Sequence, residues 1–596
     1  MEGTIYLGDI KKDMPQEEPE DKNPVVEAKN TPSEDSYKPV STVQGSLSKP
    51  IRAYIEKFRN ALKKEKEKAS TPIVVDELAS RIAKFYEKIR RVIDWKEEHL
   101  MRRSVIERIL KRRLISEISG AGLLPDVDPK KIAEPLVLEL VRSGYFENGT
   151  IPKERIIDVQ KILEKYVYIL RNGPIKNGNG SYSSKKKKSA GVKKRVNFYN
   201  WILEVASCEI EEVLDPALRE NALIELMTDC LVDRVKLIPE GKLSEEEAYV
   251  QTYIAVHQTI FNLDEPLVAY HVLKHKHPEF IENDSEKYPH FAENSEKIWS
   301  EIVSDLDHVN APDFYRVAEK FDAPYLILGD VFNKLEETPE EIEDKLMDAP
   351  LLDGFVDDAY GKRLETLKSR LFRSAIFSTL SIFVAGGVSL FIFEVPIANW
   401  IHGSWSPWAL VADILIPTAL MFLLVWAIKP PDDSNLEKIK EEVEKIIKHN
   451  EKQDIYEVKV VKKVRKILNF IFIAIYLAGG FGALYLTYWV FSLAHVPWTS
   501  LYIDTANVAV VVFAAMVIRQ KAKELTVEEK SNFIEFIVDF FSIPLAKIGL
   551  WLSTKWKEYN IVSVFFATLI DIPFSGLVET IEGWRDFLKE KRTDIH

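Results

Sequence analysis

Twenty consecutive residues from Ser374 to Phe393, SAIFSTLSIFVAGGVSLFIF, contain no charged side chain. At a helical rise of about 1.5 Å per residue, this length covers the roughly 30 Å hydrocarbon core of a bilayer. Three similar segments follow, and four in succession exceed what the core of a soluble protein needs. The sequence therefore predicts transmembrane helices at about 374–394, 407–428, 467–492 and 498–518.

Lysine and arginine are distributed unevenly around these segments. Five lie within 362–373, eleven within 429–466 and three within 519–523, whereas the short loops between paired spans contain none. The positive-inside rule places such an excess of positive charge in the cytoplasm. We therefore expect a multi-pass protein of the cell inner (plasma) membrane, with both termini and the helical loop at 429–466 in the cytoplasm.

The four predicted spans resemble two copies of one hairpin. Ala385-Gly386-Gly387 recurs as Ala478-Gly479-Gly480, at an offset of 93, and Asp413 recurs as Asp504, at an offset of 91. Both copies start and end on the same side, so the repeat would be parallel, with an axis along the membrane normal. Chance similarity between two apolar hairpins is the alternative, because membrane segments use few residue types.

The rest of the chain is helical in pattern, with no alternating strand pattern of any length. Apolar residues recur at three- and four-residue steps, which is typical of amphipathic helices. We expect an all-α fold: a polytopic helical membrane protein with tandem transmembrane hairpins and a large cytosolic helical N-terminal region. The expected divisions are a disordered acidic tail at 1–50, cytosolic helical regions at 51–171 and 196–362, a flexible Gly/Ser/Lys linker at 172–195, the four spans within 363–523, and a C-terminal region at 524–596 that is amphipathic and interfacial, re-entrant, or two further spans.

The composition excludes several classes of protein. The 596 residues carry a net charge of −12, so no nucleic-acid partner is expected. Two cysteines cannot build a disulfide framework or a cysteine zinc site. The chain also lacks the Walker A, dinucleotide-binding, nucleophile-elbow and CxxC patterns. We therefore expect no cofactor, and the lack of these signatures weighs against an enzyme.

Two aspartates lie inside predicted spans. Asp413 and Asp504 follow Trp408 and Trp498 by five and six residues, about 7 to 9 Å below the interface that tryptophans mark. A carboxylate at that depth must face the bundle, pair or stay protonated, which makes it a functional candidate. With Glu394 nearby, the acids suggest a cation or proton site. The alternative is that each caps a helix or bonds a neighbouring hydroxyl.

Two histidines have the spacing of metal ligands. His271 and His275 are four residues apart, which places both imidazoles on one helix face. However, the HExxH pattern is absent, and Pro278 ends the helix shortly afterwards. A solvated, histidine-rich helix end is the alternative to a metal site.

A basic cluster, RRSVIERILKRR, occupies residues 102–113. Next to an anionic inner leaflet, such cations hold a soluble region against lipid head groups. The candidate lipid contacts are Arg102, Arg103, Lys111, Arg112 and Arg113. A solvated helix face is the alternative.

The run LKSRLFRSAIFSTLSIFVAGGVSLFIFEVP at 367–396, followed by ILIPTALMFLL at 414–424 and PPDDSNLEKI at 430–439, resembles an uncharacterised family of membrane proteins. That family consists of multi-spanning proteins from small-genome candidate-phylum (Patescibacteria-like) bacteria and has no assigned activity. The likeness covers the first hairpin and the helical residues just before it. It implies a bacterial membrane protein and nothing catalytic.

Two functions fit this organisation best. The first is a membrane-anchored scaffold whose cytosolic helices bind partner proteins, because much of the chain is cytosolic and catalytic motifs are lacking. The second is a transporter or channel-like protein that moves a cation or small solute through the bundle, because the hairpins repeat and carry paired acids. A membrane enzyme acting on lipid or cell-wall precursors is third. The expected partners are the lipid bilayer and cytosolic proteins, and a homo-oligomer is compatible with this organisation.

Overall fold

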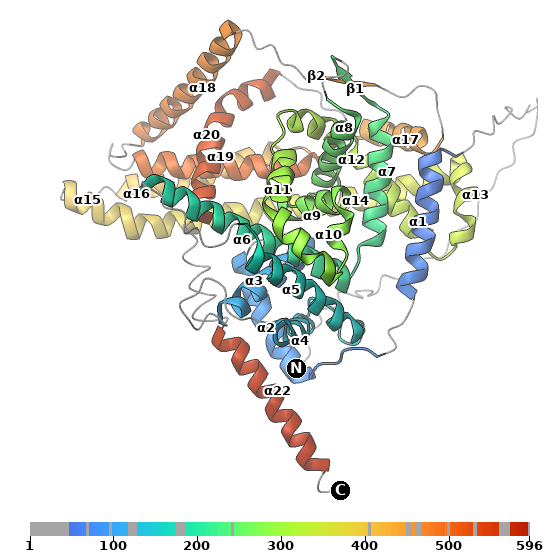
Figure 1. Ribbon diagram of the computed structural model, residues 1–596. Coiled ribbons are helices and arrows are strands. Elements are labelled where there is room, and N and C mark those ends of the chain that lie inside the picture. The colour runs from blue at the N-terminus through green and yellow to red at the C-terminus, as the bar shows by residue number, and fades with distance from the viewer. Residues whose placement is uncertain are drawn as a thin grey trace, which may run out of the picture. The chain divides into compact units, whose positions relative to one another are not determined.

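The computed structural model describes residues 47–66, 71–94, 98–116, 128–174, 185–239, 243–402, 407–448, 455–459, 466–494, 496, 501–527, 533–558 and 572–593. Within these residues the fold is all-α apart from two short strands, which confirms the fold class at that level (Figure 1). Residues 1–46 of the predicted disordered tail lie outside the described part, and the first helix already begins at Lys49.

The helices fall into a mainly polar N-terminal series and a largely apolar C-terminal series. The first series is α1 (Lys49–Lys66), α2 (Glu77–Asp94), α3 (Glu98–Ser116), α4 (Pro129–Arg142), α5 (Glu154–Asn172), α6 (Lys185–Leu214), α7 (Leu218–Val232), α8 (Glu245–Ile260), α9 (Glu265–Lys276), α10 (Pro278–Ile281), α11 (Tyr288–Leu306), α12 (Ala311–Lys334) and α13 (Ile342–Met347). The second is α14 (Ala349–Ser389), α15 (Val395–His402), α16 (Pro407–Trp426), α17 (Ser434–Ile447), α18 (Lys466–Leu493), α19 (Leu501–Ala522), α20 (Phe533–Glu558) and α22 (Ile572–Thr593).

A small parallel sheet joins distant parts of the chain. Strand β1 (Val235–Ile238) pairs with β2 (Tyr456–Lys459), so that Val235 lies opposite Tyr456. Sequence analysis predicts no strand at either place, because four residues are too few to show an alternating pattern. The strand β2 also lies within the loop that was expected to be helical, of which α17 forms the helical part.

Two hydrophobic cores organise the soluble body, which we define as the described residues from 47 to 367 together with α17 and β2. The first core draws mainly on α3, α4, α5, α6, α9 and α11. The second draws on α1, α7, α12, the first half of α14, α17 and the residues Leu525 and Val527 just after α19. The boundary between the two cores therefore does not coincide with the predicted linker at 172–195. Helix α6 packs with α3 and α5, although the linker separates it from them in the sequence.

The predicted linker at 172–195 is also shorter than expected. Residues 175–184 lie outside the described part, but α6 begins at Lys185 and includes the whole lysine run. Lysine is a good helix former, and a single glycine such as Gly191 costs a helix only about 1 kcal/mol. Composition alone therefore overestimated the linker, because a polar residue run can extend an established helix.

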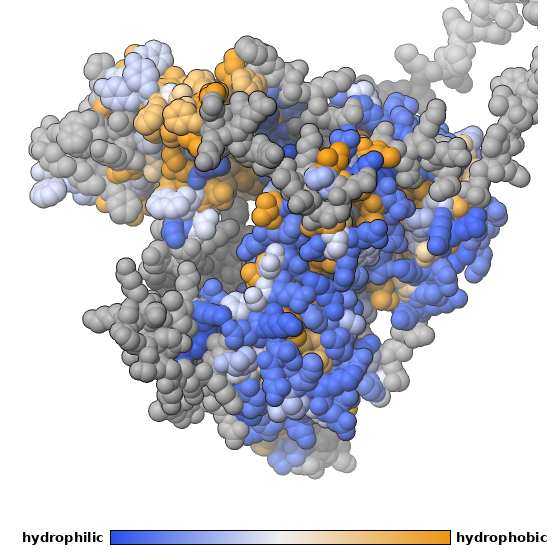
Figure 2. All heavy atoms as spheres, turned by 45° about the horizontal axis from the view of Figure 1, so that its top comes forward, coloured by the Kyte–Doolittle hydropathy of each residue, from blue (hydrophilic) through white to orange (hydrophobic). Residues whose placement is uncertain are grey.

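Among the residues that the structure describes, four helices are long and apolar enough to cross a membrane: Ala349–Ile392, Phe470–Leu493, Ile503–Ala522 and Glu535–Lys555. The first three overlap the predicted spans at 374–394, 467–492 and 498–518. The predicted span at 407–428 corresponds to a shorter apolar helix, Leu410–Trp426, and the fourth candidate falls in the region whose course the sequence left open. Figure 2 shows hydrophobic side chains gathered over these helices, whereas the remaining described surface in that view is mostly hydrophilic.

The two predicted hairpins pack differently. A Cβ added at Gly386 of α14 would lie 3.7 Å from Ile414 of α16, an ordinary contact, so the two helices are neighbours here without needing a glycine. A Cβ at Gly479 of α18 would instead lie 2.6 Å from the carbonyl oxygen of Phe540 in α20. The recurring glycines therefore serve different neighbours, and the internal repeat stays a prediction from sequence.

Candidate functional site

Two aspartates occupy buried faces of the apolar helices. Asp413 of α16 is 3 % exposed and Asp504 of α19 is 0 % exposed. Helices α16 and α19 pack against each other, and α14 packs against both. On α16 the buried face continues from Asp413 to Met421, and on α19 it continues from Asp504 to Val511. Met421 and Val511 belong to one hydrophobic cluster, so the acids lie on the helix faces that form the interior of the bundle.

This arrangement satisfies the requirement that a carboxyl in a bilayer face protein rather than lipid. Asp413 and Asp504 each have a polar or electrostatic interaction within the chain. Gly386 of α14 lies near Ile414, the residue after Asp413, so α14 passes close to this part of α16. Glu394, the third predicted acid, ends the π-helical turn Leu390–Glu394, and its side chain lies outside the described residues.

A buried asparagine holds the soluble ends of three apolar helices together. Asn435, in the first turn of α17, is 6 % exposed. Its amide nitrogen donates a hydrogen bond to the carbonyl oxygen of Leu525 at 2.5 Å, and its amide oxygen accepts one from the backbone N–H of Val527 at 2.9 Å. The same amide nitrogen lies 3.4 Å from the hydroxyl of Tyr360 in α14. We call these four residues the juxtamembrane joint.

The residues of the joint lie next to the ends of apolar helices in the sequence. Tyr360 precedes the apolar half of α14, Asn435 follows α16, and Leu525 follows α19. The joint thus fixes three helix ends to one another and to the second core. Sequence reasoning missed Asn435, although it lies in the quoted run PPDDSNLEKI. A polar residue in the first turn of an amphipathic helix gives no sign of its partners.

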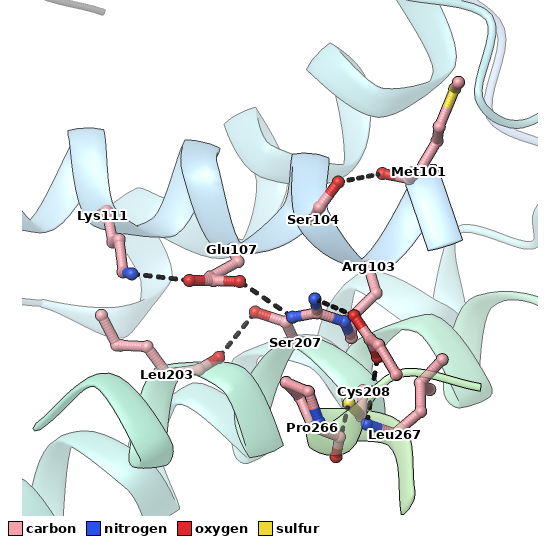
Figure 3. A network of polar contacts seen from close by, with 11 residues as sticks. Met101, Arg103, Ser104, Glu107, Lys111, Leu203, Ser207, Cys208, Pro266 and Leu267 are labelled. Atoms are coloured by element: carbon pink, nitrogen blue, oxygen red, sulfur yellow. Dashed lines mark hydrogen bonds and ion pairs between the residues drawn. The ribbon is translucent and has the colours of Figure 1, made fainter. Parts of the chain in front are cut away.

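A second polar network centres on Arg103, which is 2 % exposed (Figure 3). Its guanidinium donates to Glu107 at 2.8 Å and to Asp264 at 2.6 Å, and Lys111 donates to Glu107 at 2.6 Å. Burial by itself would raise the pKa of Glu107, but Lys111 and Arg103 outweigh it and hold that pKa below its ordinary value. The network joins α3 to the start of α9 and serves as a structural brace.

The other predicted lipid contacts are paired in the same way. Arg112 and Arg113 both bond Glu139 of α4, and Arg102 bonds Asp215. With Arg103 and Lys111 bonded to Glu107, each of the five cations has an ion pair with a carboxylate of the same chain. These ion pairs support the alternative of a solvated helix face, and contact of these residues with lipid head groups stays a prediction from sequence.

A buried ion pair holds the middle of the first core. Lys165 of α5 donates to both carboxyl oxygens of Glu209 in α6, at 2.7 and 2.8 Å, and to the carbonyl oxygen of Phe280 at 2.9 Å. The hydroxyl of Tyr166 donates to Glu209 at 2.6 Å. Burial raises the pKa of Glu209 and lowers that of Lys165, whereas their mutual contact opposes both changes. With its donors and acceptors satisfied, this cluster pins α5, α6 and α10 together.

The predicted metal ligands lie in a stack of rings. His271 lies 4.6 Å from buried His257 of α8 between ring centroids, and His275 lies 5.4 Å from the ring of Tyr253. Burial, with a contribution from Lys274, lowers the pKa of His271 to about 4. Within the residues that the structure describes, no group of three or more metal-ligating side chains is placed to hold an ion. His271 and His275 therefore pack among aromatic rings here.

Together, these features define an all-α protein with several membrane-spanning candidates and a large soluble body built on them. A comparison with known protein families finds no match, and comparisons with curated proteins and with solved structures find none either. The resemblance of the first hairpin to an uncharacterised bacterial family accordingly stays a prediction from sequence.

Proposed function

We propose that the protein is a membrane-anchored scaffold, whose soluble body binds cytosolic partner proteins at the inner face of the bacterial inner membrane. The observation that carries this proposal is the juxtamembrane joint. Through Asn435 and Leu525, the segments that follow α16 and α19 become part of the second core. A soluble body fixed at several helix ends is held in a defined position at the bilayer, as a docking platform requires.

The packing of α17 supports placing the soluble body on one side of the membrane. Ile439, Val443 and Ile446 of α17 lie in the second core with residues of α1 and α12. The loop between the two predicted hairpins and the N-terminal helices must then share a side. The lysine-rich character of that loop favours the cytoplasmic side.

Helix α2 offers the partner-binding surface that we would test first. Leu78 and Phe85 are seven residues apart, hence on one helix face, and are 43 % and 68 % exposed. Exposed apolar side chains on one face are typical of protein interaction sites when a partner covers them. Lys130 of α4 is an exposed polar position suitable as a control.

The test uses the full chain, because an isolated fragment ending at residue 360 would lack α17 and β2. The chain is purified from its native membranes in mild detergent, with and without Leu78→Glu/Phe85→Glu. We expect a soluble protein to co-purify in stoichiometric amounts with wild type and with Lys130→Glu, and to be lost from the double variant. A chain that purifies alone contradicts the proposal.

A conduit for cations or small solutes is the second candidate, because Asp413 and Asp504 both face the bundle interior. The protein is reconstituted into liposomes, and proton, monovalent and divalent cation fluxes are measured for wild type and for Asp413→Asn/Asp504→Asn. Flux that the folded double variant abolishes would establish a conduit. Absence of flux with these ions favours the scaffold.

A further inference from the structure

Four exposed cations lie at the soluble ends of α14 and α16. Lys368, Arg370 and Arg373 precede the apolar half of α14, and Lys429 follows α16. Unlike the basic cluster of α3, none of the four has an ion pair with any residue that the structure describes. We call them the α14–α16 cationic patch.

Packing of the neighbouring apolar residues places these cations at the same end of the helix bundle. Leu371, which lies next to Arg370, and Ile428, which lies next to Lys429, both pack on the cluster that contains Met421. The patch therefore gathers at one end of the bundle instead of being spread along it.

The corresponding cation of α19 is neutralised. Arg519 follows Ile518 of the same cluster, but its guanidinium bonds Asp539 and lies 3.7 Å from Glu535, both in α20. Among the residues that the structure describes, Arg519 thus has carboxylate partners, whereas the four cations of the α14–α16 cationic patch have none. A negatively charged partner from outside the chain would complete them.

The surface beside the patch indicates what that partner is. Phe372 and Phe377 of α14 are 67 % and 63 % exposed, and Trp426 of α16 is 77 % exposed. Exposed aromatic side chains directly beside cations are typical of the bilayer interface, where rings lie among head groups and long basic side chains reach outward to phosphate. An acidic soluble protein would complement the cations and leave these rings in water.

We propose that the α14–α16 cationic patch binds the phosphate of anionic phospholipids in the leaflet next to the soluble body. Arg370 and Arg373 are three residues apart on one helix face, and arginine binds phosphate through paired N–H donors. This inference rests on the proposed membrane anchoring of α14 and α16. It also moves the anionic-lipid site from α3, where the sequence placed it, to the helices that enter the bilayer.

The test compares lipid retention by the full chain. Protein is reconstituted in vesicles containing equal amounts of phosphatidylcholine and phosphatidylglycerol, extracted in mild detergent, and the bound lipids are quantified by mass spectrometry. We expect enrichment of phosphatidylglycerol on wild type, reduced on the order of fivefold for each cation removed in Arg370→Gln and Arg370→Gln/Arg373→Gln. The matched control is Arg102→Gln/Arg112→Gln, which removes charges of α3 and should retain the wild-type enrichment.

Further arms separate the possible failures. Arg370→Lys/Arg373→Lys should keep most of the enrichment, which excludes loss through misfolding, and inorganic phosphate in the buffer should not displace the lipid. Equal lipid ratios on wild type and on the glutamine variants would overturn the lipid site. Membrane anchoring is tested independently by flotation with pure phosphatidylcholine vesicles: a chain that floats but shows no lipid preference refutes only the patch, whereas a chain that does not float refutes the anchoring itself.

Discussion

Replacing Asn435 by alanine removes the centre of the juxtamembrane joint. The change leaves the carbonyl oxygen of Leu525 and the N–H of Val527 without their partner. Leu525 is 1 % exposed and Val527 is 8 % exposed, so water does not replace the lost bonds. An unsatisfied buried polar group costs about 1–3 kcal/mol, and two of them give a loss of about 4 kcal/mol. For a body of this size, that corresponds to a decrease in Tm of about 8 °C.

The assay is thermal unfolding of the full chain in detergent, followed by circular dichroism, together with hydrogen exchange of the backbone amides. Tyr360→Phe removes only the weaker bond at 3.4 Å and should lower the free energy of unfolding by less than about 1 kcal/mol. Asn294→Ala, which removes an asparagine whose hydrogen bonds are exposed, is the matched control. In Asn435→Ala the amides of α17 should exchange faster, whereas those of α5 in the first core should not.

Two results would refute this reasoning. If Asn435→Ala melts with the control, the two backbone groups find other partners and the joint does not stabilise the body. If exchange accelerates equally in both cores, the asparagine supports the fold in general and does not specifically attach the ends of the apolar helices.

Three further predictions concern other parts of the molecule. Lys165→Met should lower the free energy of unfolding by about 3–5 kcal/mol, because Glu209 is then buried without its cation. Lys165→Met/Glu209→Leu should recover much of this loss, and thermal melting of both variants measures the difference. The folded-state pKa of His271, about 4, lies below the ordinary 6.5, so the folded protein binds fewer protons between these values. This contribution to stability is fully present above pH 6.5 and is lost as the pH falls through 4, so that about 2 kcal/mol of it is already lost at pH 5. His271→Gln should therefore flatten the dependence of Tm on pH. Gly549→Ala should separate α20 from α19, because the added Cβ would lie 2.3 Å from a carbonyl oxygen of α19. A Cβ added at Gly387 would have no other atom within 4 Å, so Gly387→Ala should keep the detergent stability of wild type.

Local composition predicted the apolar helices but not their partners. The charge-free run at 374–393 is sufficient to define a candidate span, because length and hydrophobicity are properties of the segment itself. The docking of α17 in the second core was not predictable in this way, since periodicity shows that a helix has an apolar face and not what that face contacts. The strands β1 and β2 were missed for the same reason, because their pairing depends on a distant segment.

In the candidate site, too, the sequence predicted properties of single residues but not all of their partners. The burial of Asp413 and Asp504 agrees with the cost of exposing a carboxyl to lipid, which the sequence alone implies. The ion pairs of the basic cluster of α3 were only partly predictable: Glu107 lies in the run itself, but Glu139 lies 27 residues from Arg112, and Asp264 lies 161 residues from Arg103. A run of like charges in a sequence does not reveal whether its counter-charges fold back onto it.

The pairing of β1 with β2 also sets an order of events during synthesis. Strand β1 leaves the ribosome well before β2, and the apolar helices α14 and α16 lie between them in the chain. At translation rates of roughly 5–20 residues per second, β1 waits on the order of tens of seconds for its partner. With α14 and α16 in a bilayer, their delivery to the insertion machinery falls within that interval. If α14 and α16 are inserted during that interval, the second core is completed only after the first hairpin has entered the bilayer, and insertion then acts as a checkpoint for the folding of that core.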